Sequence, residues 1–314
     1  MANILVTGAS GFLGTNLVYR LLDSNNKITV LTHKPHNLWR LGKIIFGLDV
    51  RTVDLTKIEE IRKAVKQTKP DIVFHLATYG VYSYQDNFDN IIQTNIAGSV
   101  NLMNVLSEYN IKKFVNLGSS FEYGPKLAKI KETNDMDPLT VYGVSKVAQT
   151  NFVQYFAKHR NLPAVTLRIF NAYGMFEERN RLIPSLMLSA LTRKTLHIKN
   201  PKEIRDFIFV KDVVDAMIKA SKIKKSGVIF NIGTSNGYSV EQIVKKSSKI
   251  TNSDTIVFDS NEKPENHRKL IANIDEAKKT LGWKPKVSID RGLKETFDWF
   301  KHNIHLYKFA KLRQ

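Results

Sequence analysis

The chain contains no cysteine. Disulfide bonds, thiolate catalysis and zinc or iron–sulfur sites built on cysteine are therefore excluded. Its eight histidines form no His-Glu-x-x-His pattern, so a metal site has little support. No apolar run approaches the ~20 residues of a membrane span, and the first residues lack the basic head and long apolar stretch of a signal peptide. We therefore expect a cytoplasmic protein without a resident metal.

Acidic residues are scarce: 29 Asp and Glu stand against 48 Lys and Arg, a formal net charge of +19. Such an excess is compatible with nucleic-acid binding. The lysines are, however, spread along the chain in pairs such as Lys112-Lys113 and Lys278-Lys279, and no helix-turn-helix, zinc-finger or RNA-binding signature is visible. We therefore expect no nucleic-acid partner and no membrane partner. A milder use of the charge is attraction of small anionic molecules.

Strands and helices alternate along the first half of the chain. Apolar strands are predicted over residues 3–7, 28–32, 50–53, 71–75, 113–118 and 164–168. Helical spacing predicts helices over 16–22, 58–67, 88–109 and 140–159. This alternation predicts an α/β fold with a doubly wound parallel sheet of the Rossmann type.

After Asn171 the rhythm changes. Helices are predicted near 182–192, 275–281 and 289–302, with short strands at 195–198, 206–210 and 228–231. We predict a first domain over 1–171, with its sheet completed by segments within 207–250. A smaller interleaved α/β lobe is predicted over 172–206 and 251–314.

A glycine-rich turn, Gly8-x-x-Gly11-x-x-Gly14, joins the first strand to the first helix. Glycines let backbone N–H groups approach a pyrophosphate, and the N-terminus of the following helix favours its negative charge. The spacing differs from Gly-x-Gly-x-x-Gly, and a glycine turn without a ligand is the alternative. Asp54, at the end of the third strand, can hydrogen-bond an adenine amino group.

The second strand ends in Leu31-Thr32-His33-Lys34. NAD-binding folds usually hold an acid here for the ribose 2′-hydroxyl. No acid is present, and two potentially basic groups would suit a 2′-phosphate. The segment favours NADP over NAD as the cofactor; the alternative is that Lys34 is an ordinary loop lysine.

Tyr142-Gly-Val-Ser-Lys146 places a tyrosine and a lysine four residues apart, on one face of a predicted helix. An unperturbed phenol has a pKa near ~10, and a neighbouring ammonium lowers it. A tyrosine tuned in this way can exchange a proton with a sugar hydroxyl or ketone near neutral pH. Alone the pair is a weak signal, since the same spacing occurs on solvated helix faces.

Together with further motifs in a fixed order, the chain resembles the extended short-chain dehydrogenase/reductase family, in its NAD(P)-dependent nucleotide-sugar epimerase, dehydratase and reductase branch. The resemblance runs from Ile4 to about Phe300. The motifs are Gly8-Ala-Ser-Gly-Phe-Leu-Gly14, Asp54-Leu55, His75-Leu-Ala-Thr78, Thr94-Asn95-Ile-Ala-Gly98, Gly118-Ser-Ser-Phe-Glu-Tyr-Gly124, Tyr142-Gly-Val-Ser-Lys146, Arg168-Ile-Phe-Asn-Ala-Tyr-Gly174, Arg181-Leu-Ile-Pro184, Arg205-Asp-Phe-Ile-Phe-Val210, Phe230-Asn-Ile-Gly233 and Leu281-Gly-Trp-Lys-Pro285.

The resemblance implies a catalytic triad. Ser119, four residues before Tyr123, would hydrogen-bond the reacting oxygen. Tyr142 would be the proton donor or acceptor, and Lys146 would hold the nicotinamide ribose and lower the Tyr142 pKa. The first domain would bind NAD(P) through Gly8, Gly11, Phe12, Leu13, Gly14, His33, Lys34, Asp54, Leu55, Leu76, Ala77, Asn95, Tyr142 and Lys146.

The resemblance also assigns the smaller lobe to a nucleotide-diphosphate sugar. Arg205 matches a diphosphate-binding arginine and Asn171 a sugar- or phosphate-contacting asparagine. Lys263 stands where the family has a second phosphate-binding arginine, with Arg268 close enough to substitute. The substrate contacts so assigned are Thr78, Ser120, Asn171, Arg205, Lys263 and Arg268. By the same analogy the protein would be a homodimer, paired through helices 88–109 and 140–159.

The resemblance implies one of three reactions: dehydration, reduction or epimerisation. Family 4,6-dehydratases carry an Asp-Glu pair directly after the catalytic Ser or Thr. Here Ser120 and Phe121 stand in those positions, and Glu122 is expected on the other face of a strand-like segment, which argues against a dehydratase. The missing acid after the second strand favours a 4-keto-6-deoxyhexose 4-reductase using NADPH. The alternative is a 4-epimerase with tightly bound NAD, and a minor alternative is a non-catalytic, cofactor-sensing protein.

Overall fold

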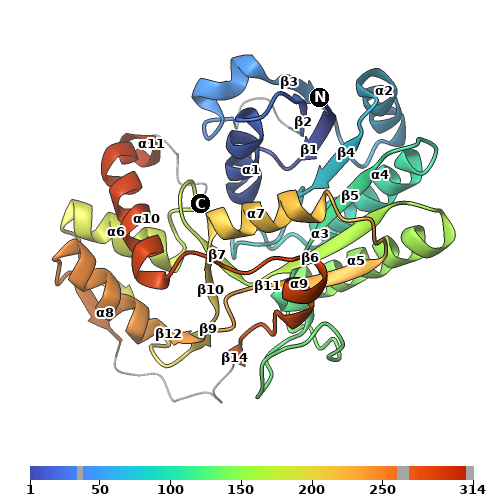
Figure 1. Ribbon diagram of the computed structural model, residues 1–314. Helices are drawn as coiled ribbons and strands as arrows, with labels where there is room; N and C mark the ends of the chain where they lie inside the picture. The colour runs from blue at the N-terminus through green and yellow to red at the C-terminus, as the bar shows by residue number, and fades with distance from the viewer. Residues whose placement is uncertain (34–37, 260–268, 309–314) are drawn as a thin grey trace.

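The computed structural model describes residues 1–33, 38–259 and 269–308. A seven-stranded parallel sheet runs through it in the order β11-β6-β5-β4-β1-β2-β3 (Figure 1). The strands are β1 (Asn3–Thr7), β2 (Lys27–Thr32), β3 (Asp49–Thr52), β4 (Ile72–His75), β5 (Lys113–Ser119), β6 (Ala164–Ile169) and β11 (Val228–Ile232). The predicted Rossmann-type sheet is confirmed.

Helices cover both faces of this sheet. One face carries α1 (Phe12–Leu22) and α7 (Val210–Ala220), and the other carries α2 (Ile58–Thr68), α4 (Gly98–Leu106) and α5 (Val141–His159). Successive side chains of a strand point to opposite faces. Ile4 and Val6 therefore pack into the core under α1 and α7, while Leu5 packs into the core under α2 and α4.

The strand order reverses beside β1. The chain passes from β1 to β2 and β3 on one side, and β4 then returns to the other side of β1. In such sheets ligands bind outside the carboxyl ends of the strands at the point of reversal. The Gly8–Gly14 turn follows β1 at this edge, and Ser119 ends β5 at the same edge.

The helix predicted over 88–109 is interrupted. It consists of α3 (Phe88–Ile92), a π-helical turn η2 (Gln93–Ala97) and α4, which ends at Leu106. Asn95 lies in the π turn with a fully buried side chain. Single π turns inside helices are frequent at functional sites, and periodicity alone does not reveal them.

A second, smaller lobe has its own core. There α6 (Leu182–Thr192), α8 (Val240–Thr251) and α10 (Ile289–Asn303) pack together around Met187, Phe209 and Leu293. Short strands complete the lobe and its junction: β7 (Asn171–Tyr173), β8 (Leu196–Ile198), β9 (Ile204–Arg205), β10 (Phe207–Phe209), β12 (Tyr238–Ser239), β13 (Ile256–Phe258) and β14 (Lys269–Leu270). The remaining elements are η1 (Gly42–Gly47), η3 (Ser120–Glu122), α9 (Asp275–Thr280) and α11 (His305–Lys308). The residue boundaries predicted for the two units stay a prediction.

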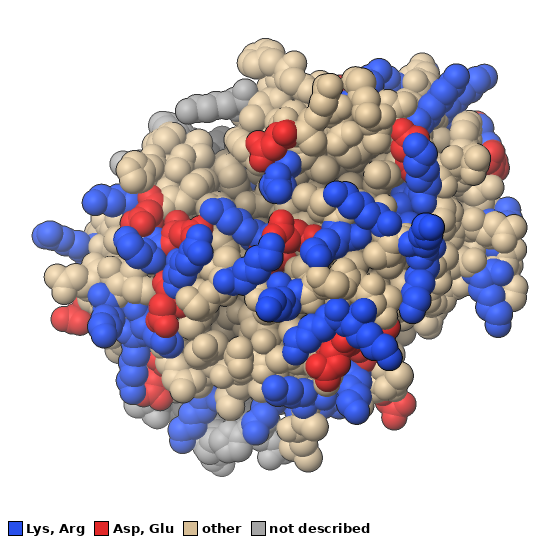
Figure 2. All heavy atoms as spheres, viewed as in Figure 1, with Lys and Arg blue, Asp and Glu red and all other residues tan. Residues whose placement is uncertain are grey.

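Basic side chains are spread over the surface with carboxylates between them, as Figure 2 shows for one face. Several pairs bridge neighbouring elements, such as Lys211 with Glu295 and Lys246 with Asp290. In the part of the chain that the structure describes, no helix is long and apolar enough to cross a membrane. The same residues contain no group of three or more His, Asp or Glu side chains that could hold a metal ion.

Candidate active site

A cavity of about 1180 Å³ opens at the carboxyl edge of the sheet. The ends of β1, β4, β5 and β6 form one wall, and residues of the 171–181 segment form part of the opposite wall. The volume exceeds the ~300–1,000 Å³ of a pocket for one small ligand. It is in keeping with a cofactor and a substrate bound side by side.

The glycine turn at one end of the cavity is closely packed. Gly8 has a φ of +69°, and a Cβ there would lie 2.6 Å from the Ala77 nitrogen. A Cβ at Gly14 would overlap the carbonyl oxygen of Gly8. Only glycine fits at these two positions, and the N-terminus of α1 begins at once after Gly11. This cradle fits the diphosphate of a dinucleotide.

The other predicted cofactor contacts lie along the same cavity. Gly11, Phe12, Leu13, His33, Asp54, Leu55, Leu76 and Ala77 all line it. His33 Nδ1 lies 4.0 Å from Asp54 Oδ1, and the same carboxylate oxygen accepts a hydrogen bond from the Thr56 backbone (2.9 Å). Lys34, the second basic group predicted here, lies outside the described residues.

Ser119 and Tyr142 meet at the centre of the cavity wall. Thr140 caps the N-terminus of α5 by accepting a hydrogen bond from the Gly143 backbone (3.0 Å), which places Tyr142 in the first turn. Burial raises the pKa of Tyr142 to about 12, against a lowering effect of the nearby Ser119 and Thr78 side chains. In this structure the phenol is therefore less acidic than an exposed one, and the predicted lowering by Lys146 is not seen.

Lys146 is turned toward the protein interior. Its Nζ donates to the Leu117 carbonyl oxygen (2.6 Å) and to Gln149 Oε1. Burial lowers the pKa of Lys146 to about 8, against an opposing effect of the Glu122 charge. The lysine is thus held by two acceptors rather than by the phenol, which explains why it does not acidify Tyr142 here.

A chain of hydrogen bonds runs from Gln149 to the first strand. Ser99 Oγ donates to the Asn95 carbonyl oxygen (2.7 Å), so it accepts from Gln149 Nε2 (2.7 Å) and from His75 Nε2 (2.8 Å). The Nδ1 of His75 then accepts from Thr7 Oγ1 (2.7 Å). Burial lowers the pKa of His75 to about 3, so the ring is neutral. This network fixes Gln149 and, through it, the direction of Lys146.

Asn95 does not line the cavity. Its Oδ1 accepts from the Tyr79 backbone (2.8 Å) and from Thr78 Oγ1 (3.1 Å), and its Nδ2 donates to the Tyr79 carbonyl oxygen (2.8 Å) and to Ser145 Oγ (2.9 Å). All four hydrogen-bonding positions of the amide are used by protein partners. The predicted cofactor contact of Asn95 stays a prediction. Asn95 holds the 78–79 loop against α5.

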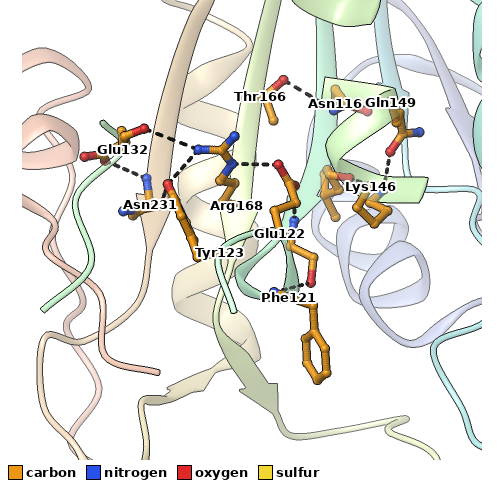
Figure 3. A network of polar contacts seen from close by, with 12 residues as sticks. Asn116, Phe121, Glu122, Tyr123, Glu132, Lys146, Gln149, Thr166, Arg168 and Asn231 are labelled. Carbon is orange, nitrogen blue, oxygen red and sulfur yellow. Dashed lines mark hydrogen bonds and ion pairs between the residues drawn. The ribbon is translucent and has the colours of Figure 1, made fainter. Parts of the chain in front are cut away.

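Glu122 faces away from the cavity, as predicted, but for another reason. It lies in the short 3₁₀ turn η3, not in a strand-like segment. Its carboxylate binds the Ser119 backbone and Arg168 behind the cavity wall (Figure 3). Ser120 and Phe121, which follow Ser119, line the cavity itself.

Three of the residues predicted to contact a substrate line the cavity: Thr78, Ser120 and Asn171. Asn171 Nδ2 is buried with no hydrogen-bond partner among the described residues. Arg205 is not among the described residues that line the cavity; its guanidinium binds both carboxylate oxygens of Glu203 (2.9 and 2.6 Å). Lys263 and Arg268 lie outside the described residues.

Four charged residues that line this cavity have no predicted role: Arg40, Glu177, Glu178 and Arg181. Arg40 donates to the Phe176 carbonyl oxygen (2.8 Å) and lies 3.3 Å from Glu178 Oε2. Arg181 and the buried Glu177 line the opposite wall, 3.8 Å apart between Nε and Oε1. The available signal was the run of charge, Glu-Glu-Arg-Asn-Arg, between Gly174 and the helix that starts at Leu182.

Known proteins match this chain over nearly its whole length. The profile of the NAD dependent epimerase/dehydratase family matches residues 4–233. The human dTDP-D-glucose 4,6-dehydratase is 27% identical, over 97% of this chain and 91% of its own length. The UDP-glucose 4-epimerase of Lactobacillus helveticus is also 27% identical, over 97% of this chain and 99% of its own length.

Solved structures agree with these sequence matches. The UDP-glucose 4-epimerase of Thermotoga maritima with UDP-glucose has a TM-score of 0.87 at 28% identity, covering 96% of this chain and 99% of that one. The UDP-glucuronic acid 4-epimerase of Bacillus cereus with UDP-glucuronic acid and NAD has a TM-score of 0.85 at 27% identity, covering 96% and 99%. The resemblance inferred from the ordered motifs is confirmed, and this chain belongs to the NAD dependent epimerase/dehydratase family.

Proposed function

We propose that this protein is a nucleotide-sugar 4-epimerase that retains NAD. The observation that carries the proposal is the triad of Ser119, Tyr142 and Lys146 on one cavity wall, beside a glycine turn that fits a dinucleotide. The relatives at 26–28% identity that are named as 4-epimerases, several solved with a UDP-sugar, support the epimerase over the reductase that the sequence alone favoured.

The residues of this chain would move a proton at the sugar O4. A bound nicotinamide supplies the hydride acceptor and donor at C4. Tyr142, as the phenolate, would take the O4 proton while C4 is oxidised, and would return it when C4 is reduced on the opposite face. Ser119 hydrogen-bonds the same oxygen, and the Lys146 ammonium favours the phenolate when the two groups come together.

Elimination of water is not expected. A 4,6-dehydratase needs an acid and a base next to the catalytic Ser or Thr, and Ser120 and Phe121 supply neither. Glu122 is fully buried and engaged by Arg168 on the far side of η3. The 27% identity to dTDP-D-glucose 4,6-dehydratases therefore supports a shared fold and first oxidation step, without the second step.

The substrate would bind across the two lobes. Arg181 lies at the N-terminus of α6, where backbone N–H groups add positive potential. Together with the unpartnered Asn171 amide, it offers donors to the diphosphate or sugar of a nucleotide-diphosphate sugar. Contacts from Arg205, Lys263 and Arg268 stay predictions.

A 4-keto-sugar reductase using NADPH is the second candidate. The observation in its favour is the end of β2, where His33 stands in place of an acid and lines the cavity. Both candidates use the same triad, and they differ in whether the cofactor is exchanged during each turnover.

We also propose a homodimer formed through α5 and its neighbours. On α5 the apolar side chains of Val144, Phe152 and Tyr155 are 51, 39 and 52% exposed. Phe88 on α3 is 59% exposed. An apolar face on adjacent helices is suited to a second copy of the chain. Sedimentation at micromolar concentration should give a dimer; a monomer would contradict this proposal.

The cofactor test separates the two functions. We expect purified protein to carry NAD that survives dialysis and to interconvert UDP-glucose and UDP-galactose, or another C4 pair of UDP-sugars, without added cofactor. Protein that arrives without cofactor and oxidises added NADPH with a 4-keto-6-deoxy sugar nucleotide would instead establish the reductase. Failure of both assays across UDP-, dTDP-, CDP- and GDP-sugars would refute the proposal.

A further inference from the structure

A buried carboxylate lies directly behind the proposed triad. Glu122 is fully buried, and its two oxygens have separate partners. Oε1 accepts from the Ser119 backbone nitrogen (2.7 Å), and Oε2 accepts from Arg168 Nε (2.7 Å). Figure 3 shows this contact between β6 and the turn that follows β5. Glu122 does not stand at either of the two acid–base positions of a 4,6-dehydratase, so that reaction gives it no role.

The contact with Ser119 is built into the backbone. A Cβ at Gly118 would lie 2.6 Å from Glu122 Oε1, so any larger residue there would push the carboxylate away. Ser119 Oγ in turn accepts from the Phe121 backbone nitrogen (3.2 Å) and closes the turn. Ser119 is therefore fixed at both its backbone and its hydroxyl, with Glu122 supplying the backbone acceptor.

The charges nearest Glu122 come from two elements, β6 and α5. Arg168 on β6 is its ion-pair partner, and the Glu122 charge acts to raise the pKa of Lys146 on α5. Tyr142 on α5 is acted on by Glu122 and, with opposite sign, by Arg181 across the cavity. A further set of residues surrounds Arg168 on the side away from Glu122 and forms a second layer: Tyr123, Glu132 and Asn231.

That second layer holds Arg168 in place. Its Nη1 donates to the Tyr123 hydroxyl (2.7 Å) and lies 3.4 Å from the Glu132 carbonyl oxygen. Tyr123 donates onward to Asn231 Oδ1 (2.8 Å), and the Glu132 carboxylate accepts from the Asn231 backbone (2.7 Å). Arg168 is thus held by Glu122, Tyr123 and the Glu132 carbonyl oxygen, and Glu122 keeps one oxygen for Ser119.

We propose that Glu122 is a positioning residue for the proposed reaction: its carboxylate fixes Ser119 and places a negative charge behind Tyr142 and Lys146. This inference rests on the proposed function only for its kinetic consequence. The charge acts on the dyad whether or not a sugar is turned over.

The sign of the electrostatic effect is defined. A negative charge disfavours the phenolate and favours the ammonium, so Glu122 raises the pKa of both Tyr142 and Lys146. Removing the Glu122 charge should therefore lower the pKa of both groups. The basic limb of any pH–rate profile that depends on them should move to lower pH as well. A residue that only supports the fold would lower the rate equally at every pH.

The variants must remove the charge without leaving Arg168 unpaired, because a buried charge that loses its partner is strongly destabilising. We would pair Glu122→Gln with Arg168→Met, which keeps an acceptor for the Ser119 nitrogen. The second pair, Glu122→Met with Arg168→Met, removes that acceptor as well. Glu132→Gln is the matched control, since it removes a carboxylate on the far side of Arg168.

Ionisation of residue 142 is read directly. In each protein Tyr142→3-fluorotyrosine would be introduced and titrated by fluorine NMR, with NAD added as the probe. We expect both double variants to titrate lower than the parent, by up to about one pH unit, because Glu122 acts on Tyr142 more strongly than Arg168, which lies behind it. Glu132→Gln should titrate with the parent. Equal midpoints in all four proteins would overturn the electrostatic part of the proposal.

Turnover, measured with Tyr142 intact, tests the positioning part. Glu122→Gln/Arg168→Met should keep more of kcat than Glu122→Met/Arg168→Met, by about tenfold, because only the former still holds Ser119. Equal kcat in the two would overturn it. If the parent turns over no sugar nucleotide, the proposed function fails, while the fluorine titration still decides whether Glu122 acts on Tyr142.

Discussion

The two walls of the cavity differ in how their polar groups are satisfied. Behind the wall formed by the sheet, the side chains of Asn95, Ser99, Gln149 and Glu122 all have protein partners, at 2.7–3.1 Å or in close contact. On the wall formed by the 171–181 segment, the Asn171 amide nitrogen is buried without one, within the described part of the chain. Glu177 Oε2 is in the same condition.

This contrast separates supporting groups from binding groups. A buried polar group without a partner costs free energy, on the order of 1–3 kcal/mol. Such a cost is tolerated where a ligand supplies the missing hydrogen bond. Under the proposed function, the residues behind the sheet wall would hold the catalytic geometry before substrate arrives. The wall formed by residues 171–181, which we call the second-lobe wall, would offer the Asn171 amide and the Glu177 carboxyl to the substrate.

The largest effect on turnover should come from a substitution of Tyr142, the proposed proton carrier on the sheet wall. Tyr142→Phe removes the hydroxyl that exchanges the O4 proton, so kcat should fall roughly 10²- to 10⁴-fold. Bound NAD and the thermal unfolding midpoint should change little, since the ring remains. Steady-state kinetics and cofactor absorbance check this expectation.

Tyr155→Phe is the matched control, because Tyr155 is an exposed tyrosine on the same helix. It should keep the parental kcat. A Tyr142→Phe protein with full turnover would remove the tyrosine from the mechanism.

A smaller effect, confined to binding, should follow from changing the second-lobe wall. Arg181→Gln removes a guanidinium whose one ionic partner among the described residues is Glu177. Loss of charge-assisted hydrogen bonds to the substrate should raise KM about 10- to 100-fold, equivalent to about 1.4–3 kcal/mol. The kcat should change less than KM, because Arg181 does not exchange the proton and acts on Tyr142 only through its charge.

Arg193→Gln controls for the loss of positive charge, since Arg193 is exposed at the opposite end of α6. Its KM should equal that of the parent. If Arg181→Gln lowers kcat and leaves KM unchanged, the division of labour between the two walls is wrong.

The sheet wall was largely predictable from the sequence. Gly8, Ser119, Tyr142 and Lys146 lie in short motifs. Gly8 follows β1, Ser119 ends β5, and Tyr142 and Lys146 lie in the first turns of α5. Where helices and strands are regular, the local sequence pattern is enough to predict where a side chain lies. The cavity at the carboxyl edge followed from the same reasoning.

What the sequence did not predict depends on contacts between distant segments. Gln149 reads as one more polar helix residue, and only the fold brings it between Lys146 and Ser99. The rise in the Tyr142 pKa comes from burial, which spacing within a helix does not measure. The roles of Glu177 and Arg181 depend on how the irregular 175–181 segment crosses the cavity.

The smallest effect concerns stability and comes from one buried carboxyl, that of Glu177. Burial raises the pKa of Glu177 to about 8, well above that of an exposed glutamate. Between about pH 5 and 8 the unfolded chain is ionised at this residue while the folded chain holds a proton. Folded stability should therefore fall as pH rises through this window, by on the order of 1 kcal/mol per pH unit from this residue.

Glu177→Gln should remove that slope. The difference in unfolding free energy between variant and parent, from urea denaturation at pH 5, 6, 7 and 8, should grow in favour of the variant as pH rises. Glu59→Gln, at an exposed carboxyl on α2, should run parallel to the parent. A Glu177→Gln curve parallel to the parent would mean that Glu177 ionises normally in the folded protein. The second-lobe wall would then carry a full negative charge beside Arg181, and it would no longer be the wall that leaves a cation free for substrate.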